Sequence, residues 1–392
     1  MLSIPMRVLM LSPQYRPLVG GYERAAERLS AALVTRGHRV TVIAERRDPT
    51  WPALETLDGV TLRRLWCAFK PRLHLLTSLP RFAIFLLIRG RSFDVWHVHQ
   101  YGLHSALAVA LGKLLGRPVV LKLTSSGDQG LARTAAKGGF AAISSALMRR
   151  VSAVVALTRE TKWEAQAFGI PAERVHQLGN GVDTGLFHRY GDNERAQLMN
   201  KLGIGGGGVV VAVGRLSKEK NPDGLLQAWA IAKQELSADW RLVVVGDGPM
   251  RAELEATVRT QGLGDSVRFV GQQNNIDQWI GAADIYVSSS HREGLSNTLL
   301  EAMAGGLPVV ATCVSGVNEL VKESGAGLVV DVGDMPRLAE ALVRLAGNAK
   351  LRDAMGAAGR ALIEERYSIG SVAASHEALY ASLIGVRPGA GS

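Results

Sequence analysis

Short apolar runs of strand length recur along this chain, and stretches with helical spacing of apolar residues lie between them. The first run, 7–11, leads through a Gly-Gly turn into a helix-like stretch over 23–36, and a second apolar run follows at 39–43. Further runs of the same kind lie at 95–99, 118–123 and 153–157. Strands that alternate with helices in this way predict a parallel sheet covered by helices.

The same pattern begins again after a loose join that contains four consecutive glycines, 205–208. The second series of apolar runs lies at 209–213, 241–245, 267–270, 285–288, 308–311 and 327–330. A chain of 392 residues is too long for one ordinary core. The predicted class is therefore α/β, with two doubly wound, Rossmann-like domains in tandem. Such sheets bind ligands beyond the carboxyl ends of their strands, so a cleft between facing domains is the expected site.

Charge is divided unevenly between the two halves. Residues 1–190 hold 26 Lys and Arg against 12 Asp and Glu, whereas residues 191–392 hold 19 against 23, so the balances of +14 and −4 sum to +10. A basic half is compatible with nucleic acid, an anionic membrane surface or an acidic ligand. Zinc-finger spacing, an aromatic and basic RNA-binding signature and a clear helix-turn-helix are all missing from the sequence, so nucleic acid is not an expected partner.

The two cysteines, Cys67 and Cys313, fall in different halves and form no metal or redox motif. They are expected to be buried free thiols in a reducing compartment. The first six residues lack a basic region followed by a signal-type apolar stretch, so no export signal is expected. The apolar region 75–88 is broken by Pro80 and Arg81 and is short of the ~20 residues that a membrane span needs. A cytoplasmic protein without a span is expected.

Two acids, Glu293 and Glu301, bracket a strand-to-helix passage of the second series. They lie about two helical turns apart if the intervening chain is helical. Acids on helices are usually solvated. Here Leu299, Leu300, Ala302 and Met303 surround the second acid in sequence. A carboxylate among core-type residues needs a partner, which points to a functional pair.

Further motifs accompany this E-x(7)-E segment over nearly the whole chain. In order they are Gly20-Gly21-Tyr22-Glu23, Asp94-Val95-Trp96-His97-Val98-His99, Asn180-Gly181-Val182-Asp183 with Phe187, Gly214-Arg215-Leu216 with Lys220, Gly246-Asp247-Gly248-Pro249, and Gly316-Val317-Asn318-Glu319. No single motif is decisive, but their order and spacing together are specific. The chain resembles the retaining glycosyltransferases of family 4, which have the two-domain GT-B fold.

The resemblance implies an acceptor-binding domain over 1–190 and a nucleotide-sugar-binding domain over 191–365. It also implies that 366–392 form a helix crossing back to the first domain and a flexible tail. The implied activity moves a hexose-type sugar from a nucleotide diphosphate sugar, with UDP favoured over GDP, to a glycan, a lipid-linked acceptor or a small molecule. No metal and no cofactor are expected, and the family's habit of docking on membranes implies a peripheral position on the inner face of the cell membrane.

Four residues are implied as catalytic: Glu293, Arg215, Lys220 and Thr124. Arg215 and Lys220, just past a strand that ends at Gly214, match the family's diphosphate-binding pair and can stabilise the leaving charge without a metal. The alternative is that the lysines here form a solvated run. By resemblance, Glu293 contacts hydroxyls of the donor sugar. The family's front-face attack makes neither acid a nucleophile, so the two-carboxylate glycosidase scheme does not apply.

The implied substrate-binding residues are Gly20, Gly21, Gly214, Gly294, Leu295, Ser296, Asn297, Thr298, Glu301 and His99. Gly20 and Gly21 let the backbone approach a phosphate before a helix N-terminus, although Gly-Gly alone is more often an ordinary turn. The run Ser296–Thr298 is expected to cap the helix that carries Glu301. By resemblance, Glu301 holds the two ribose hydroxyls.

One departure from the family pattern concerns the segment after the strand 119–123. Many members carry a histidine near the reacting sugar, where this chain has Thr124-Ser125-Ser126-Gly127. Hydroxyls do not titrate near neutral pH, so any histidine-dependent role is in doubt. His97 and His99 lie on the preceding strand, where core histidines and ligand contacts are both open interpretations.

The stretch 70–91 interleaves basic and apolar residues and fits an interfacial helix or a core helix with basic ends equally well.

Two functions other than glycosyl transfer also stay open. A non-hydrolysing nucleotide-sugar epimerase shares the architecture, and a nucleotide-sugar-binding protein without catalysis would share the site. Turnover with and without an acceptor separates these possibilities from a transferase. No segment resembles the pyridoxal phosphate lysine of a phosphorylase.

Overall fold

The computed structural model describes residues 4–17, 20–68, 71–124, 131, 141–205 and 207–386. The chain divides into two compact units, Met1–Gly181 with Ile369–Ser392, and Val182–Ser368. Each is built on a largely parallel sheet, so the predicted two-domain α/β class is confirmed. The boundaries predicted after residues 190 and 365 both fall inside the second unit. The chain enters this unit at Val182, whose N–H donates to Tyr367 O at 2.9 Å, beside the point where it leaves.

The first unit contains an eight-stranded sheet with the order β3-β4-β2-β1-β5-β6-β7-β8. Only β3 is antiparallel to its neighbour. The strands are β1 (Arg7–Leu11), β2 (Arg39–Arg46), β3 (Leu54–Leu57), β4 (Val60–Trp66), β5 (Val95–His99), β6 (Val119–Leu123), β7 (Ala153–Ala156) and β8 (Val175–Gln177). The chain runs outward in one direction from β1 and in the other from β5, so the switch point where such sheets bind ligands lies between these two strands.

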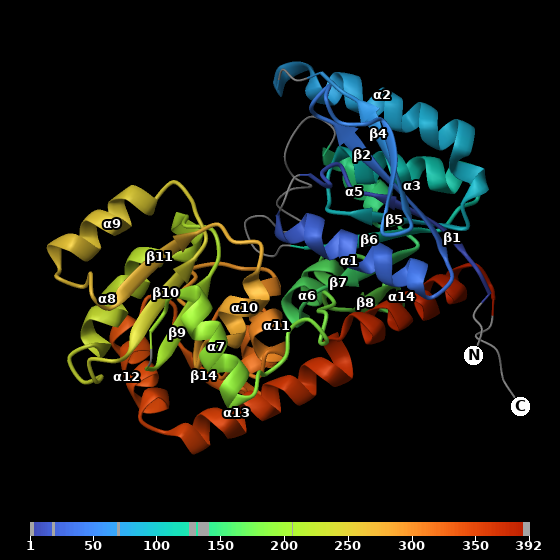
Figure 1. The fold of residues 1–392 in the computed structure, drawn as a ribbon. Helices are drawn as coiled ribbons and strands as arrows, with labels where there is room; N and C mark the ends of the chain where they lie inside the picture. The colour runs from blue at the N-terminus through green and yellow to red at the C-terminus, as the bar shows by residue number, and fades with distance from the viewer. Residues whose placement is uncertain are drawn as a thin grey trace, which may run out of the picture. The chain divides into compact units, whose positions relative to one another are not determined.

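Helices cover both faces of this sheet, because alternate residues of each strand point to opposite faces. Leu9 and Leu11 of β1 enter one hydrophobic core, whereas Val8 and Met10 enter the other. The helices are α1 (Gly21–Thr35), α2 (Pro71–Arg89), α3 (Leu103–Leu115), α5 (Ala141–Met148), α6 (Arg159–Ala167) and α14 (Ile369–Leu383). The last of these, from the end of the chain, packs beside α1 and places Tyr380 in the second core (Figure 1).

Helix α2 contains Pro80, which was expected to break the apolar region. The stretch Leu73–Ser92 is 20 residues long and is apolar enough to cross a membrane by length and composition alone, with 22% of it buried in the structure. The expectation that this region is far too short to span is therefore wrong. Phe82 and Leu86 lie in the core, whereas Leu76 is 69% exposed. One face of α2 is thus a core face and another is apolar and exposed.

The second unit contains a six-stranded parallel sheet with the order β11-β10-β9-β12-β13-β14. Its strands are β9 (Val209–Val213), β10 (Arg241–Val245), β11 (Val267–Gly271), β12 (Ile285–Ser288), β13 (Val309–Thr312) and β14 (Gly327–Val330), each within a residue or so of the apolar runs in the sequence. The chain runs outward from β9 and then outward from β12, so the switch point of this unit lies between these two strands.

The helices of the second unit are α7 (Asp192–Leu202), α8 (Pro222–Ala232), α9 (Arg251–Thr260), α10 (Ile276–Gly281), α11 (Asn297–Ala304), α12 (Met335–Ala346) and α13 (Ala349–Leu362). Helices α8, α9 and α12 pack around the fully buried Trp229, whose indole N–H donates to Ser266 Oγ at 3.1 Å, and the other helices, whose residues the structure describes, contribute no fully buried residue to that core. Asn221 begins α8: its side chain accepts from the Gly224 N–H at 3.2 Å. The loop before this cap carries the first residues of the candidate site.

Candidate functional site

The loop after β9 begins at Gly214 and is locked against the loop after β10. The Gly214 N–H donates to Val245 O at 2.9 Å, and the Leu216 N–H donates to Asp247 O at 3.0 Å. Gly246 has φ +141, and a Cβ there would lie 1.9 Å from Gly214 O. Only glycine fits this close approach. The backbone from Gly214 to Leu216 is therefore fixed at the carboxyl end of β9, and it presents Arg215 as an exposed side chain.

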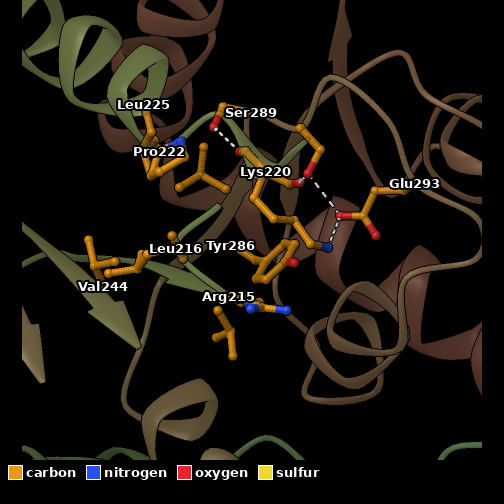
Figure 2. A pocket seen from close by; sticks show the side chains of 15 residues that line it. Arg215, Leu216, Lys220, Pro222, Leu225, Val244, Tyr286, Ser289 and Glu293 are labelled. Carbon is orange, nitrogen blue, oxygen red and sulfur yellow. Dashed lines mark hydrogen bonds and ion pairs between the residues drawn. The ribbon is translucent and has the colours of Figure 1, made fainter. Parts of the chain in front are cut away.

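Lys220 ends a short 3-10 turn, η4 (Lys218–Lys220), which is tied to the end of β12. The Ser289 hydroxyl donates to Asn221 O at 2.8 Å and lies 3.2 Å from Lys220 O. The ammonium group of Lys220 then reaches Glu293 and forms an ion pair with its Oε1 (Figure 2). Two residues predicted from separate motifs therefore meet at the switch point of the second unit.

Glu293 lies in a loop that is not helical, and α11 begins only at Asn297. The supposed two-turn helical spacing between Glu293 and Glu301 is therefore wrong. The Glu293 side chain is 8% exposed, and its Oε1 also accepts from the Ser290 hydroxyl at 2.8 Å. Two donors on one oxygen of a nearly buried carboxylate hold the group in place.

Helix α11 starts where β9 and β12 end. Ser296 is its N-cap residue but makes no side-chain capping bond, so the expected cap is wrong in this respect. The Ser296 hydroxyl instead lies 3.2 Å from Thr298 Oγ1, which donates to Val213 O at 3.2 Å and lies 2.9 Å from the Tyr286 hydroxyl. Burial, with the charge of Glu293, raises the pKa of Tyr286 well above its ordinary value. Tyr286 thus stays a neutral hydroxyl.

The remaining candidates of this unit follow from the same segment. Gly294 lies in the loop, Leu295 is buried beside the helix start, and Asn297 is the first helical residue. Glu301, one turn into α11, is 1% exposed and keeps polar contacts within the protein. A cavity of about 40 Å³ lies among Arg215, Lys220, Tyr286, Ser289 and Glu293. This is far below the ~300 Å³ of ordinary ligand pockets. The Lys220 and Glu293 side chains fill much of the site.

The candidates in the first unit lie near its own switch point. Gly20 is the N-cap residue of α1, with an extended backbone, and Gly21 is the first helical residue. A Cβ at Gly20 would lie 2.2 Å from Glu23 Oε2, so the carboxylate of Glu23 already covers the turn that was expected to receive a phosphate. Thr124 follows β6 and is half-buried. Ser125, Ser126 and Gly127 lie outside the described residues.

Two family models match this chain and together cover most of it. The model described as glycosyl transferases group 1 matches residues 194–362, and the model of the glycosyl transferase 4-like domain matches residues 20–181. The mannosyltransferase LpsB of lipopolysaccharide core biosynthesis from Rhizobium meliloti is 30% identical over 303 residues, which are 75% of this chain and 81% of LpsB. The chain belongs to the group 1 glycosyltransferases.

Other similar proteins agree with this family and with the GT-B fold. N-acetyl-alpha-D-glucosaminyl L-malate synthase from Bacillus anthracis is 23% identical over 372 residues, which are 93% of this chain and 94% of that enzyme. Among solved structures, HepE from Anabaena, determined in complex with UDP, superposes with a TM-score of 0.79 at 20% identity over 96% of this chain and all of HepE. The chain is therefore a sugar-transferring enzyme.

In this glycosyltransferase, His99 is 3% exposed, and its Nε2 is buried without a hydrogen-bond partner among the described residues. Its ring stacks on His97 at 4.5 Å between centroids. Burial, with the neighbouring charge of Lys122, holds the pKa of His99 well below its ordinary value, and burial lowers the pKa of Lys122 to about 8. His97 Nδ1 lies 2.5 Å from the Tyr380 hydroxyl of α14. Both interpretations of His99, a core histidine and a ligand contact, therefore stay predictions.

Several residues that position the site were missed from the sequence. Ser289 fixes the backbone of Lys220, Ser290 donates to Glu293, and Tyr286 contacts Thr298. The available signal was the run Ser288-Ser289-Ser290 at the end of an apolar strand. Hydroxyls placed at the carboxyl end of a strand next to the switch point are natural site residues.

Proposed function

We propose that this chain is a retaining glycosyltransferase that moves a hexose-type sugar from a nucleotide diphosphate sugar without help from a metal ion. The observation that carries this proposal is the convergence of Arg215, Lys220 and Glu293 with the start of α11 at the ends of β9 and β12. Two cations, a carboxylate and a helix N-terminus at one switch point suit a diphosphate joined to a sugar.

The cations are proposed to stabilise the leaving diphosphate. Arg215 and Lys220 supply two positive charges from one rigid loop, which does not need to reorganise as charge develops. The start of α11 adds backbone N–H groups that the Ser296 side chain does not cap. These groups take the place that a divalent cation has in other phosphoryl chemistry, which supports metal-independent transfer.

Glu293 and Glu301 are proposed to bind the donor rather than to attack it. Glu293 accepts from Lys220 and Ser290, and its remaining oxygen can accept from a sugar hydroxyl. Glu301 is proposed to accept from the ribose hydroxyls. An ion-paired carboxylate is a poor nucleophile, which supports a front-face route in which the leaving phosphate takes the acceptor proton and the anomeric configuration is retained.

Uridine diphosphate is the proposed carrier in preference to guanosine diphosphate. HepE was solved with UDP and with UDP-glucose. Against this, one relative is named a GDP-mannose-dependent alpha-mannosyltransferase. Both nucleotides therefore belong in the test.

The proposed acceptor is a glycan, a glycolipid or a small molecule, reached by a cytoplasmic enzyme at the inner face of the membrane. The exposed apolar face of α2 supports peripheral binding, with Leu76 at 69% and Ile88 at 72% exposure. Arg81, whose guanidinium lies 4.5 Å from the centre of the Trp66 ring, and Arg89 add positive charge on or beside this face. Apolar and basic groups together suit an anionic lipid surface.

A binding and hydrolysis screen tests the proposal. Purified protein is titrated with UDP, GDP, ADP and their common sugar conjugates without added metal, and slow donor hydrolysis is followed in the same samples. Selective binding with hydrolysis, and no gain from added Mg²⁺ or Mn²⁺, is expected. Conversion of the donor into its epimer would establish the epimerase alternative instead. Nucleotide-sugar binding without any turnover, even with a panel of glycan and lipid acceptors, would favour the non-catalytic alternative.

A further inference from the structure

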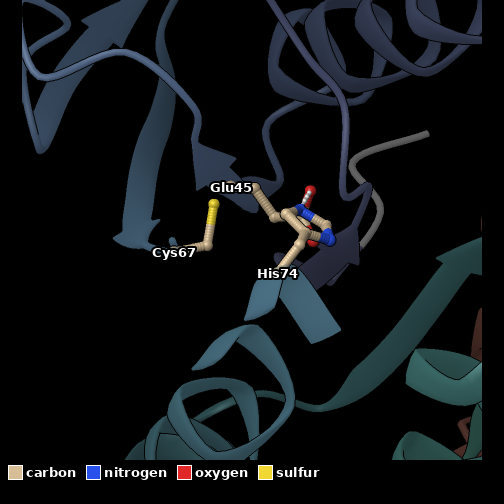
Figure 3. A group of neighbouring side chains, drawn as sticks. All are labelled: Glu45, Cys67 and His74. Carbon is tan, nitrogen blue, oxygen red and sulfur yellow. Dashed lines mark hydrogen bonds and ion pairs between the residues drawn. The ribbon is translucent and has the colours of Figure 1, made fainter. Parts of the chain in front are cut away.

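Three potential metal ligands meet in the first unit, and a fourth lies beside them. Among the residues that the structure describes, one group of three, Glu45, Cys67 and His74, holds its ligand atoms within 4.8 Å of one another (Figure 3). Glu45 lies near the end of β2, Cys67 follows β4, and His74 lies on α2. His104 of α3 is a fourth neighbour, with Nε2 3.6 Å from Glu45 Oε1.

The Glu45 carboxylate is buried and only partly satisfied. Its side chain has no exposed surface. Oε2 lies 2.9 Å from His74 Nε2 and accepts from the Arg47 guanidinium at 2.7 Å, whereas the buried Oε1 has no hydrogen-bond partner. Buried carboxylate oxygens are almost always satisfied, because leaving one without a donor costs about 1–3 kcal/mol or more. A cation held by Oε1 would remove this cost.

The donor atoms indicate which cation fits. A thiol sulphur and two imidazole nitrogens are soft and borderline ligands, which disfavour Mg²⁺ and Ca²⁺. One sulphur, one imidazole nitrogen and one carboxylate oxygen are ordinary Zn²⁺ ligands, and a second imidazole can complete a four-coordinate set. We propose that Glu45, Cys67 and His74 form a binding site for one divalent transition metal of the Zn²⁺ type. His104 lies outside this group of three and would have to move toward it to become the fourth ligand. Binding would replace the thiol proton of Cys67, which is released to solvent.

Charge balance separates this proposal from a simple ion-pair network. In the network, Arg47 neutralises Glu45 and Cys67 is a bystander thiol. In the metal site, the thiolate and the carboxylate together neutralise the two charges of the ion, and Arg47 is an unneeded competitor. Arg47 can leave this position at little cost because its side chain is 34% exposed. The two interpretations therefore predict opposite roles for Cys67 and Arg47.

A metal at this position would join β2, the end of β4, α2 and α3. Helix α2 carries the exposed apolar face, so the ion would fix the orientation of that helix against its sheet. If His104 moved in as the fourth ligand, the coordination sphere would be closed, which is typical of structural rather than catalytic sites. The metal proposal does not depend on the proposed roles of Arg215, Lys220 and Glu293, which lie in the second unit.

Metal titration of the full chain tests the proposal. Protein stripped with a chelator is titrated with Zn²⁺ and separately with Co²⁺, and bound metal is quantified after desalting. We expect one tightly bound ion per chain, a thiolate-to-cobalt charge-transfer band and a rise in Tm on zinc binding. Cys67→Ser and His74→Gln should each weaken zinc binding by more than about 100-fold, the upper end of the loss on removing an outer partner of a metal ligand.

Two further variants serve as matched controls. Cys313→Ser removes the other, exposed cysteine and should leave the affinity, the charge-transfer band and the Tm shift unchanged. Arg47→Gln should keep or tighten zinc binding, whereas in a plain ion-pair network it would only lower the Tm. Circular dichroism confirms that each variant is folded. Wild-type protein that binds less than one ion per chain, or a Cys67→Ser variant that binds zinc as well as Cys313→Ser does, would overturn the site.

Discussion

Lys220 and Glu293, which are 73 residues apart in the chain, form an ion pair at the switch point of the second unit. The resemblance implies that one binds the diphosphate and the other the sugar, so in the proposed function their contact would link the two halves of the donor. A diphosphate that takes the ammonium of Lys220 leaves Glu293 with the Ser290 hydroxyl as its donor. Diphosphate binding would therefore leave Glu293 better able to accept a hydrogen bond from a sugar hydroxyl.

Lys220→Ala is expected to lower kcat/KM for the nucleotide sugar by about 30-fold, equivalent to ~2 kcal/mol of lost transition-state stabilisation. In the proposed function, the ammonium group of Lys220 neutralises the leaving phosphate. Arg215→Ala should show a loss of similar size. The matched control is Lys218→Ala, which removes an exposed lysine of the same turn. Equal rates for Lys220→Ala and Lys218→Ala would reject the assignment of Lys220.

Glu293→Ala should separate nucleotide binding from sugar transfer. Removal of the carboxylate releases Lys220, so free UDP is expected to bind as tightly as before or more tightly. The rate of sugar transfer and the affinity for the sugar conjugate should both fall, because the carboxylate that accepts a hydrogen bond from the sugar hydroxyl is lost. Calorimetric titration with UDP and UDP-glucose beside turnover measures both quantities. Weaker UDP binding without a change in rate would contradict this role.

Glu301→Ala should abolish discrimination between ribose and deoxyribose. If the Glu301 carboxylate accepts from both ribose hydroxyls, the wild type prefers UDP to 2′-deoxy-UDP by about 1.5–3 kcal/mol, the range for a hydrogen bond to a charged group. The variant should bind the two nucleotides equally. Glu253→Ala, on the exposed part of α9, should keep the preference. A preference that survives in Glu301→Ala would place the ribose elsewhere.

Most strands of the second unit could be predicted because they are apolar runs, as is usual for buried parallel strands. The edge strand β11 keeps enough apolar residues to be found although it contains the exposed Arg268. Strands β3 and β4 were missed, since Glu55, Arg63 and Arg64 break the apolar pattern at the edge of the first sheet. Pro80 misled in the other direction. A proline removes one helical hydrogen bond, but the core contacts of Phe82 and Leu86 keep α2 continuous.

Site residues could be predicted where they follow the end of a strand in the sequence. They could not be predicted where they contact segments that are distant in the sequence. Arg215 and Lys220 come directly after β9, so their placement follows from topology alone. The bond from Ser289 to the backbone of Asn221 and the cluster of Glu45 with Cys67 depend on how loops fold together, which no local pattern encodes. Cys313, expected to be buried, is exposed because it follows the last residue of β13.

Substitutions on the exposed face of α2 should weaken binding to anionic vesicles. Leu76→Asp and Ile88→Asp each replace a highly exposed apolar side chain, and burial of such a side chain in a lipid interface is worth about 1.5–3 kcal/mol. Each 1.4 kcal/mol corresponds to about a tenfold change in affinity. Vesicle sedimentation should therefore show at least a tenfold loss of vesicle binding for each variant.

The control for these variants is Ile231→Asp, at a residue of α8 in the second unit that is 40% exposed. It should bind vesicles as the wild type does. Transfer to a soluble acceptor should be unchanged in all three variants, which separates membrane binding from catalysis. Vesicle binding that is insensitive to both α2 substitutions would remove α2 as the docking surface.

Lys122→Met should stabilise the first unit near pH 7, and the gain should shrink as the pH rises. Burial lowers the pKa of Lys122 from 10.5 to about 8, so the folded chain binds this proton less tightly than the unfolded chain does. His97 and His99, whose pKa values are well below the ordinary value, stay neutral throughout. Scanning calorimetry at pH 7 and pH 10 should show a larger difference in Tm between variant and wild type at pH 7. A difference that does not change with pH would mean that Lys122 is neutral or compensated in the folded chain.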